Sequence, residues 1–120
     1  MSEITSFPLK DIAKEYFESK YLYEEIKKGN SLKGKSGQKW NFDGVVTTQF
    51  GKFGVFIKDW NRSIGVNQVR LLEKACIDMK FKGGLLIGRN FSSHAHTYGQ
   101  AKGVQIITRS KLIYKNKYSS

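Results

Sequence analysis

Two charged side chains, Asp43 and Lys58, lie on consecutive segments that the sequence predicts to be paired β-strands. The segments WNFDGVVTT (residues 40–48) and FGVFIKDW (53–60) are separated by QFGK, a spacing typical of an antiparallel hairpin. Such a hairpin would bring Asp43 and Lys58 to the same end. A carboxylate there can hold Mg²⁺ together with water and phosphate oxygens, and a lysine beside it can orient the attacking water. The pair therefore fits metal-dependent hydrolysis of a phosphodiester.

The strand that would carry Lys58 lacks the second acid that such a metal site needs. Side chains alternate along a strand, so Phe56 and Lys58 face one side and Asp59 faces the other. A metal-dependent nuclease would carry a carboxylate two residues before the lysine, but Phe56 offers no oxygen to a metal. Asp43 and Lys58 therefore admit two interpretations, a working metal site or a half-buried ion pair kept after metal binding was lost.

The segments around this pair predict alternating helices and strands. Apolar residues recur at helical spacing in residues 8–21 and 66–80. Two short apolar runs predict strands at 83–88 and 104–108, and residues 92–103 between them predict a helix. Because strand–helix–strand units form right-handed crossovers, we expect the later strands to be parallel neighbours.

The expected architecture is an α/β three-layer sandwich, in which a mixed β-sheet is flanked by helices. A length of 120 residues is enough for one core, so we expect a single domain over residues 1–120. Residues 21–28 fit either a short strand or the end of the first helix. Residues 29–39 contain glycines, serines and lysines without periodicity, which predicts a loop.

The charge of the chain indicates a polyanionic partner. The formal net charge is +11, and six of the ten acids lie in the first 25 residues. From Met79 to Ser120 there are eight lysines and arginines and no acid. One-signed surfaces attract polyanions, whereas surfaces that only confer solubility mix both signs. Nucleic acid is therefore the expected partner, ahead of an anionic membrane surface, for which no strongly amphipathic basic helix is present.

The lysine-rich segment 27–39 is the strongest candidate for contact with phosphate. It holds five lysines and no acid, and its glycines would let backbone amides approach phosphate oxygens. The alternative is a solvated loop. Trp40 and Trp60 could stack on bases, although such aromatics more often belong to a core or an interface. The expected nucleic-acid contacts are Lys33, Lys35, Ser36, Lys39 and Arg62.

Several other classes of protein are disfavoured. The single cysteine, Cys76, rules out a disulfide framework within the chain and is most simply a buried thiol. His94 and His96 are two residues apart and would not share a helix face, so they are poor metal ligands. No apolar run approaches the ~18 residues of a membrane span, and the N-terminus lacks a signal-peptide core. We expect a cytoplasmic protein without a membrane partner or a small-molecule substrate.

The stretch from Gly34 to Leu112 resembles the Mrr-like branch of the restriction-endonuclease fold in an archaeal-type version. It is similar, more distantly, to archaeal Holliday-junction resolvases. The stretch covers about two-thirds of the chain, and its segments follow the family order. The segments that carry the resemblance are GKSGQKWNFDGVV, VFIKDW, GVNQVRLLEKA, GGLLIGRNFSSHA and GVQIITRSKL.

This resemblance implies a mixed sheet flanked by helices, DNA binding, Mg²⁺-dependent cleavage and homodimers. By the same resemblance, Asp43 matches the metal-binding aspartate and Lys58 the catalytic lysine. Gln68 matches a polar position near the site, and Glu15 loosely matches an acid on the first helix. Phe56 stands where the family carries Glu or Gln, so the resemblance does not supply the missing carboxylate.

The hypothesis that best fits the sequence is a DNA-binding protein with a nuclease fold and a degenerate metal site. The alternative is an active Mg²⁺-dependent endonuclease that uses Asp43, Glu15 and Lys58, with the main-chain carbonyl of Ile57 as a further ligand. A third reading is a docking subunit of a larger DNA repair or transcription assembly.

Overall fold

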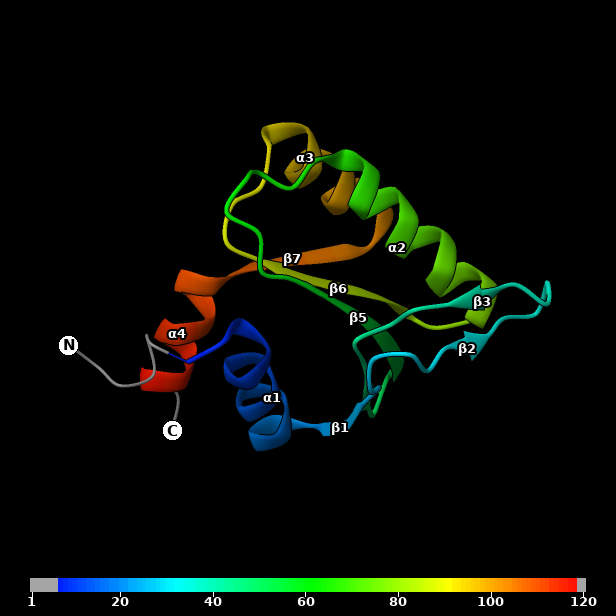
Figure 1. Cartoon of the computed structure of the whole chain (residues 1–120), viewed down its shortest axis with the longest axis horizontal. Coiled ribbons are helices and arrows are strands. Elements are labelled where there is room, and N and C mark those ends of the chain that lie inside the picture. The colour runs from blue at the N-terminus through cyan, green and yellow to red at the C-terminus, as the bar shows by residue number, and fades with distance from the viewer. Residues whose placement is uncertain (1–6, 119–120) are drawn as a thin grey trace.

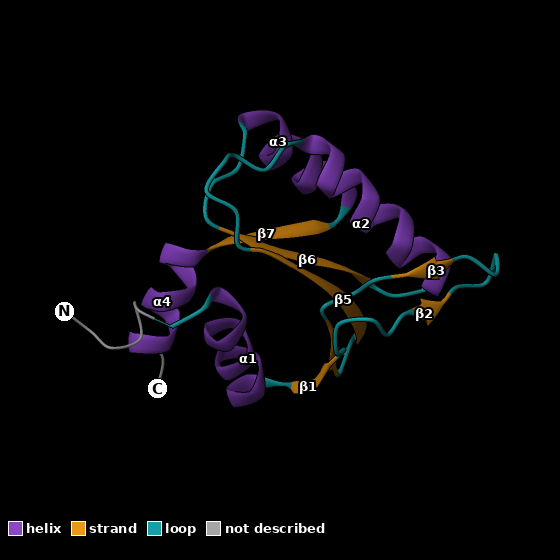
Figure 2. Ribbon diagram, in the orientation of Figure 1, coloured by secondary structure: helices purple, strands orange, loops and turns teal. Residues whose placement is uncertain are grey.

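The computed structural model describes the backbone of residues 7–118 and the side chains of residues 7–115. Five strands form a mixed sheet in the order β1-β4-β5-β6-β7, and two short strands form a separate hairpin (Figures 1 and 2). The elements in chain order are α1 (Leu9–Lys20), β1 (Leu22–Glu25), β2 (Leu32–Lys33), β3 (Lys39–Trp40), β4 (Gly44–Thr48), β5 (Gly51–Lys58), α2 (Val66–Met79), β6 (Gly83–Gly88), α3 (Ser93–Lys102), β7 (Val104–Thr108) and α4 (Arg109–Tyr118).

The sheet has the mixed topology that the sequence predicts. Strand β4 pairs with β5 as an antiparallel hairpin, with Gly44 opposite Val55. Strands β5, β6 and β7 are parallel neighbours, connected by α2 and α3. The ambiguous segment after α1 forms strand β1, which pairs antiparallel with β4 at the edge of the sheet. The expected fold class, a mixed sheet flanked by helices, is confirmed.

Two apolar cores lie on opposite faces of the sheet. The first joins α1 and α4 to the sheet through residues such as Phe17, Val55 and Leu112. The second joins α2 and α3 through residues such as Phe56, Leu72 and Ala95. Alternation along β5 divides its side chains between the two cores, as strand geometry requires. These two sides of the sheet are called the α1 face and the α2 face.

Helix α1 follows the apolar stripe predicted from the sequence. Leu9, Ile12, Ala13, Tyr16 and Phe17 are its buried residues. Helix α2 buries a stripe that includes Val69, Leu72 and Cys76. Within the described part of the chain, no helix is both long and apolar enough to cross a membrane.

The segment before Asp43 differs from the predicted arrangement. Residues 29–39 were expected to be a loop, but Leu32 pairs with Trp40 and Lys33 with Lys39 in a small antiparallel hairpin. The strand expected over 40–48 is interrupted at residues 41–43, and β4 begins only at Gly44. Contacts with α2 explain the hairpin, because Trp40 Nε1 donates a hydrogen bond of 2.8 Å to Asp78 Oδ2.

Candidate metal-site remnant at the end of the sheet

Asp43 lies at the bend that precedes β4, and its carboxylate is hydrogen-bonded to the main chain of β5. The Asp43 N–H donates to the Val55 carbonyl at 2.8 Å, and Asp43 Oδ2 accepts from the Ile57 N–H at 2.7 Å. The Asp43 carbonyl in turn accepts from the Ile26 N–H at 3.0 Å. The carboxylate thus replaces a main-chain carbonyl as the acceptor for Ile57, just beyond the last strand pair of β4 and β5.

The half-buried position of Asp43 controls its acidity. Burial raises the pKa of the Asp43 carboxyl above its usual value, because a charged carboxylate is less well solvated there. The hydrogen bond from Ile57 and the positive charges of Lys58 and Lys10 lower the pKa, but they do not outweigh burial. The carboxylate is therefore a destabilised anion in the folded protein.

Lys58 ends β5 at the same end of the hairpin as Asp43. Its Nζ lies 5.0 Å from the ring centroid of Phe56 and 5.8 Å from that of Trp60. The structure thus bears out the predicted face that Phe56 and Lys58 share. Lys58 is close enough to lower the pKa of Asp43. The structure brings Asp43 and Lys58 together, although no hydrogen bond or ion pair within 4 Å joins the two described side chains.

Phe56 belongs to the core beneath α2. It is 3% exposed, and its ring centroid lies 5.6 Å from that of Phe42. The Asp43 carboxylate, in contrast, contacts the main chain of β5, and its charge also acts on Tyr23 and Lys10 toward the α1 face. Strand β4 begins only at Gly44, so the pairing of β4 with β5 does not extend to Asp43 and Phe56.

Glu25 is an acid at this end of the sheet that the sequence analysis missed. It is the last residue of β1 and pairs with Gly44, the residue after Asp43. Lys10 Nζ lies 3.0 Å from Glu25 Oε2, and Lys14 Nζ lies 3.5 Å from Glu25 Oε1. The hydrogen bond from Lys10 is the main cause that holds the pKa of Glu25 below its usual value. The sequence did not reveal that Glu25 lies next to Asp43, because residues 21–28 also fit the end of a helix. The pairing of β1 with β4 brings the two together.

Glu15 was expected to supply the helix acid, but the structure does not bring it to Asp43. Glu15 is exposed, and no contact joins it to Asp43 within the described residues. Neighbouring residues on a helix point about 100° apart, and α1 directs Lys10 and Lys14 toward β1 instead. The face of α1 that looks toward Asp43 is therefore basic.

Gln68 lies in the first turn of α2, which follows β5 in the chain. Its Oε1 is buried and has no hydrogen-bond partner among the described residues. No contact joins Gln68 to Asp43 or Lys58 in that part of the chain. The predicted role of Gln68 near the site therefore stays a prediction.

The basic residues of the β2–β3 hairpin lie away from Lys58. The Ser36 N–H and Oγ donate to the Asp78 carboxylate at 2.9 and 2.7 Å, which anchors the hairpin at the C-terminal end of α2. Lys58 instead precedes the N-terminal end of this helix of 14 residues, which is about 21 Å long. The hairpin and Lys58 therefore lie toward opposite ends of α2. The hairpin residues concerned are Lys33, Lys35, Ser36 and Lys39.

Trp60 brings two cations together at the end of β5. The Arg62 guanidinium carbon lies 4.2 Å from the Trp60 ring centroid, so Lys58 and Arg62 both contact this ring. Asp59 points to the α1 face, where it accepts from the Leu9 N–H at 3.4 Å and from Arg89 Nε at 2.6 Å. Asp59 thus faces the side of β5 opposite Lys58, as the alternation predicts. Its carboxylate positions the start of α1.

Two histidines that the sequence analysis rejected as metal ligands lie on the surface of α3. His94 and His96 are exposed, and the His96 ring packs edge-on against Phe91 with centroids 5.8 Å apart. Within the described residues, no three side chains of the His, Cys, Asp or Glu types gather in a way that could hold a metal ion.

The chain is similar to known proteins in both sequence and fold. The Mrr_cat family model, which describes a restriction endonuclease, matches residues 2–115. Among curated proteins, none matches the chain. A crystal structure titled as a protein of unknown function, AF1548, has the same fold, with a TM-score of 0.74 and 14% sequence identity. The match covers 91% of this chain but only 65% of that chain.

Proposed function

Because the chain belongs to the restriction endonuclease family of the Mrr type, we propose that it binds DNA through a nuclease fold whose metal site is degenerate. The observation that carries this proposal is the buried Phe56 beside Lys58, at the position that would supply the second carboxylate. Lys58 therefore has an aromatic ring as its neighbour, in a cation–π contact, where an active site would have a carboxylate that holds the metal.

Restriction-endonuclease-like domains typically use Mg²⁺, and the residues present fit this ion poorly. Mg²⁺ prefers near-octahedral oxygen ligands and is usually held by one or two carboxylates plus phosphates. Asp43 Oδ2 already accepts a hydrogen bond from Ile57, and Glu25 is paired with Lys10 and Lys14. Two ammonium groups thus neutralise Glu25, and the main chain already uses one oxygen of Asp43.

The cations at the end of β5 support DNA binding. Lys58 and Arg62 both lie against the Trp60 ring, which positions two positive charges at one strand end. Arg62 is exposed, so its guanidinium can reach a phosphate. The hairpin lysines form a second basic group toward the C-terminal end of α2. Two groups near opposite ends of α2 suit contact with phosphates several nucleotides apart along a backbone.

A nuclease assay tests the degenerate site. Supercoiled, branched and single-stranded DNA are incubated with the wild type, Asp43→Asn and Lys58→Ala, each in Mg²⁺ or Mn²⁺. We expect no cutting above the protein-free control by any of the three proteins. If the wild type cuts and either substitution abolishes cutting, the degenerate site is refuted and an active endonuclease takes its place. The proximity of Asp43 and Lys58 favours that alternative.

DNA affinity as a function of salt tests the binding mode. Each neutralised phosphate contributes about 0.9 to the slope of log affinity against log salt on duplex DNA. We expect Arg62→Ala, and the triple substitution of Lys33, Lys35 and Lys39 by alanine, to weaken binding and flatten that slope. Lys74→Ala is the matched control, because Lys74 is an exposed lysine in the middle of α2. Equal losses in the control and the test variants would contradict these two contact regions.

We also propose that the protein acts as a homodimer on DNA, since a small basic platform gains reach when a two-fold axis doubles it. Sedimentation of the full chain at tens of micromolar, with and without DNA, measures the assembly. Monomers under both conditions would contradict the dimer. They would leave the docking role in a larger assembly as the better account of the two basic groups.

A further inference from the structure

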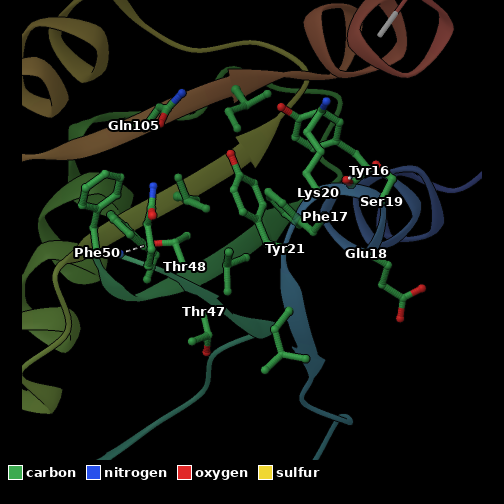
Figure 3. A pocket seen from close by; sticks show the side chains of 16 residues that line it. Tyr16, Phe17, Glu18, Ser19, Lys20, Tyr21, Thr47, Thr48, Phe50 and Gln105 are labelled. Atoms are coloured by element: carbon green, nitrogen blue, oxygen red, sulfur yellow. Dashed lines mark hydrogen bonds between the residues drawn. The ribbon is translucent and has the colours of Figure 1, made fainter. Parts of the chain in front are cut away.

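A groove of about 830 Å³ lies on the α1 face, near the turn between β4 and β5 (Figure 3). Its floor spans four adjacent strands and carries the apolar side chains of Val46, Phe53, Leu85 and Ile107, with Gln105 as a polar neighbour on β7. The C-terminal turn of α1 forms one wall. Asp43 belongs to the opposite end of the β4–β5 hairpin, so this groove is separate from the candidate metal site.

The groove exists because helices cover only part of the α1 face. Helix α1 begins at the carboxyl end of β5, where Asp59 accepts from the Leu9 N–H, and α4 follows the carboxyl end of β7. Both helices gather toward that end of the sheet (Figure 1). On the other face, α2 and α3 lie side by side over the sheet. Within the described part of the chain, the helical layer of the α1 face is therefore incomplete over the groove.

Two exposed hydrophobic side chains lie on the rim of this groove. Tyr21 and Phe50 line it and are 42% and 73% exposed. They are two of the seven large hydrophobic side chains that are exposed among the described residues. Contiguous exposed apolar surface marks a site of interaction, because leaving it in water is unfavourable. Figure 3 shows Phe50 at one end and Tyr16 with Lys20 at the other.

Charge indicates the chemistry of the occupant. Lys20 Nζ and Lys115 Nζ lie 5.8 and 6.0 Å from the ring centroid of Tyr16, at the α1 end of the groove. Glu18, the acid on the lining, extends away from the floor in Figure 3. The apolar residues of the floor do not suit phosphates, and the lysines beside Tyr16 attract acidic segments.

We propose that this groove binds an amphipathic helix of a partner protein, with apolar residues on one face and acidic residues flanking them. A helix laid on the sheet would complete the layer that α1 and α4 leave open, since helices and sheets pack as continuous layers. Its apolar face would cover Tyr21 and Phe50, and its acids would lie near Lys20 and Lys115.

The test uses a labelled synthetic helix of about 18 residues, with leucines at helical spacing and glutamates elsewhere. A matched peptide carries lysine at every glutamate position. Fluorescence anisotropy with the full chain should show saturable binding of the glutamate peptide and none of the lysine peptide. Tyr21→Ser and Phe50→Ser should each weaken binding about tenfold, as for the loss of an anchor at an interface.

Ile77→Ser is the matched control, because Ile77 is 67% exposed on α2, away from the groove. Circular dichroism verifies that each variant is folded, and DNA affinity should be unchanged in Tyr21→Ser and Phe50→Ser. The proposal is overturned if the glutamate peptide does not saturate or if the lysine peptide binds equally well. It is also overturned if Ile77→Ser weakens peptide binding as much as the groove variants do. A wild-type dimer that Phe50→Ser dissociates would overturn it too, because a second copy would then occupy the groove.

Discussion

Asp43 has two separable roles, as an acceptor for the main chain of β5 and as a half-buried charge, and two substitutions distinguish them. Asp43→Ala removes both the acceptor and the charge. Asp43→Asn keeps an oxygen that can accept from the Ile57 N–H and removes only the charge. The comparison therefore measures what each role contributes to the free energy of unfolding.

The expected magnitudes follow from the geometry. The hydrogen bond between Ile57 N and Asp43 Oδ2 is 2.7 Å long and partly buried. Leaving a buried donor without an acceptor costs about 1–3 kcal/mol. Asp43→Ala should thus lower the free energy of unfolding by about that amount at neutral pH. Asp43→Asn should be at least as stable as the wild type, because burial disfavours the Asp43 anion.

The difference in free energy of unfolding between Asp43→Asn and the wild type should depend on pH. Burial raises the pKa of Asp43 in the folded protein, so the folded state holds this proton more tightly than the unfolded state. The wild type is therefore favoured below the unfolded pKa of the carboxyl and loses that stability as the pH rises through the folded pKa. The advantage of Asp43→Asn should grow over the same range and then level off.

Urea denaturation followed by circular dichroism, in buffers from acidic to neutral pH, measures all three proteins. The reasoning is refuted if Asp43→Asn is as unstable as Asp43→Ala at neutral pH. It is also refuted if the advantage of Asp43→Asn over the wild type is largest in acid, because the carboxylate would then be a stabilised anion.

Three further predictions concern the α2 face. Phe56→Ala should lower the free energy of unfolding by about 3–5 kcal/mol in urea titrations, because the ring is 3% exposed and packs against Phe42; a loss below 1 kcal/mol would contradict its place in the core. Burial raises the pKa of the Cys76 thiol to about 12, so a thiol reagent at pH 8 should label it only in denaturant, and rapid labelling of the folded protein would exclude this burial. Asp78→Ala should speed hydrogen exchange of the Ser36 amide about tenfold, because Asp78 Oδ1 accepts from that N–H at 2.9 Å; unchanged exchange would show that the hairpin does not depend on this anchor.

The elements that the sequence alone determines are those specified by local pattern. Helix α2 and strands β6 and β7 lie where apolar periodicity and glycine boundaries predict them. The β4–β5 hairpin follows from two β-rich segments with a short separation, and it brings Asp43 and Lys58 to one end of the sheet. Family resemblance, which depends on the order of such segments, is confirmed by the family match over residues 2–115.

The features that only the tertiary structure decides depend on contacts between distant parts of the chain. The β2–β3 hairpin is anchored by Asp78, which lies 42 residues after Ser36. Glu25 comes to the Asp43 end because β1 pairs with β4, and Lys10 reaches Glu25 only when α1 packs beside β1. Such pairings have no local periodic signal, since the free energy that selects them comes from burial and hydrogen bonding across the fold.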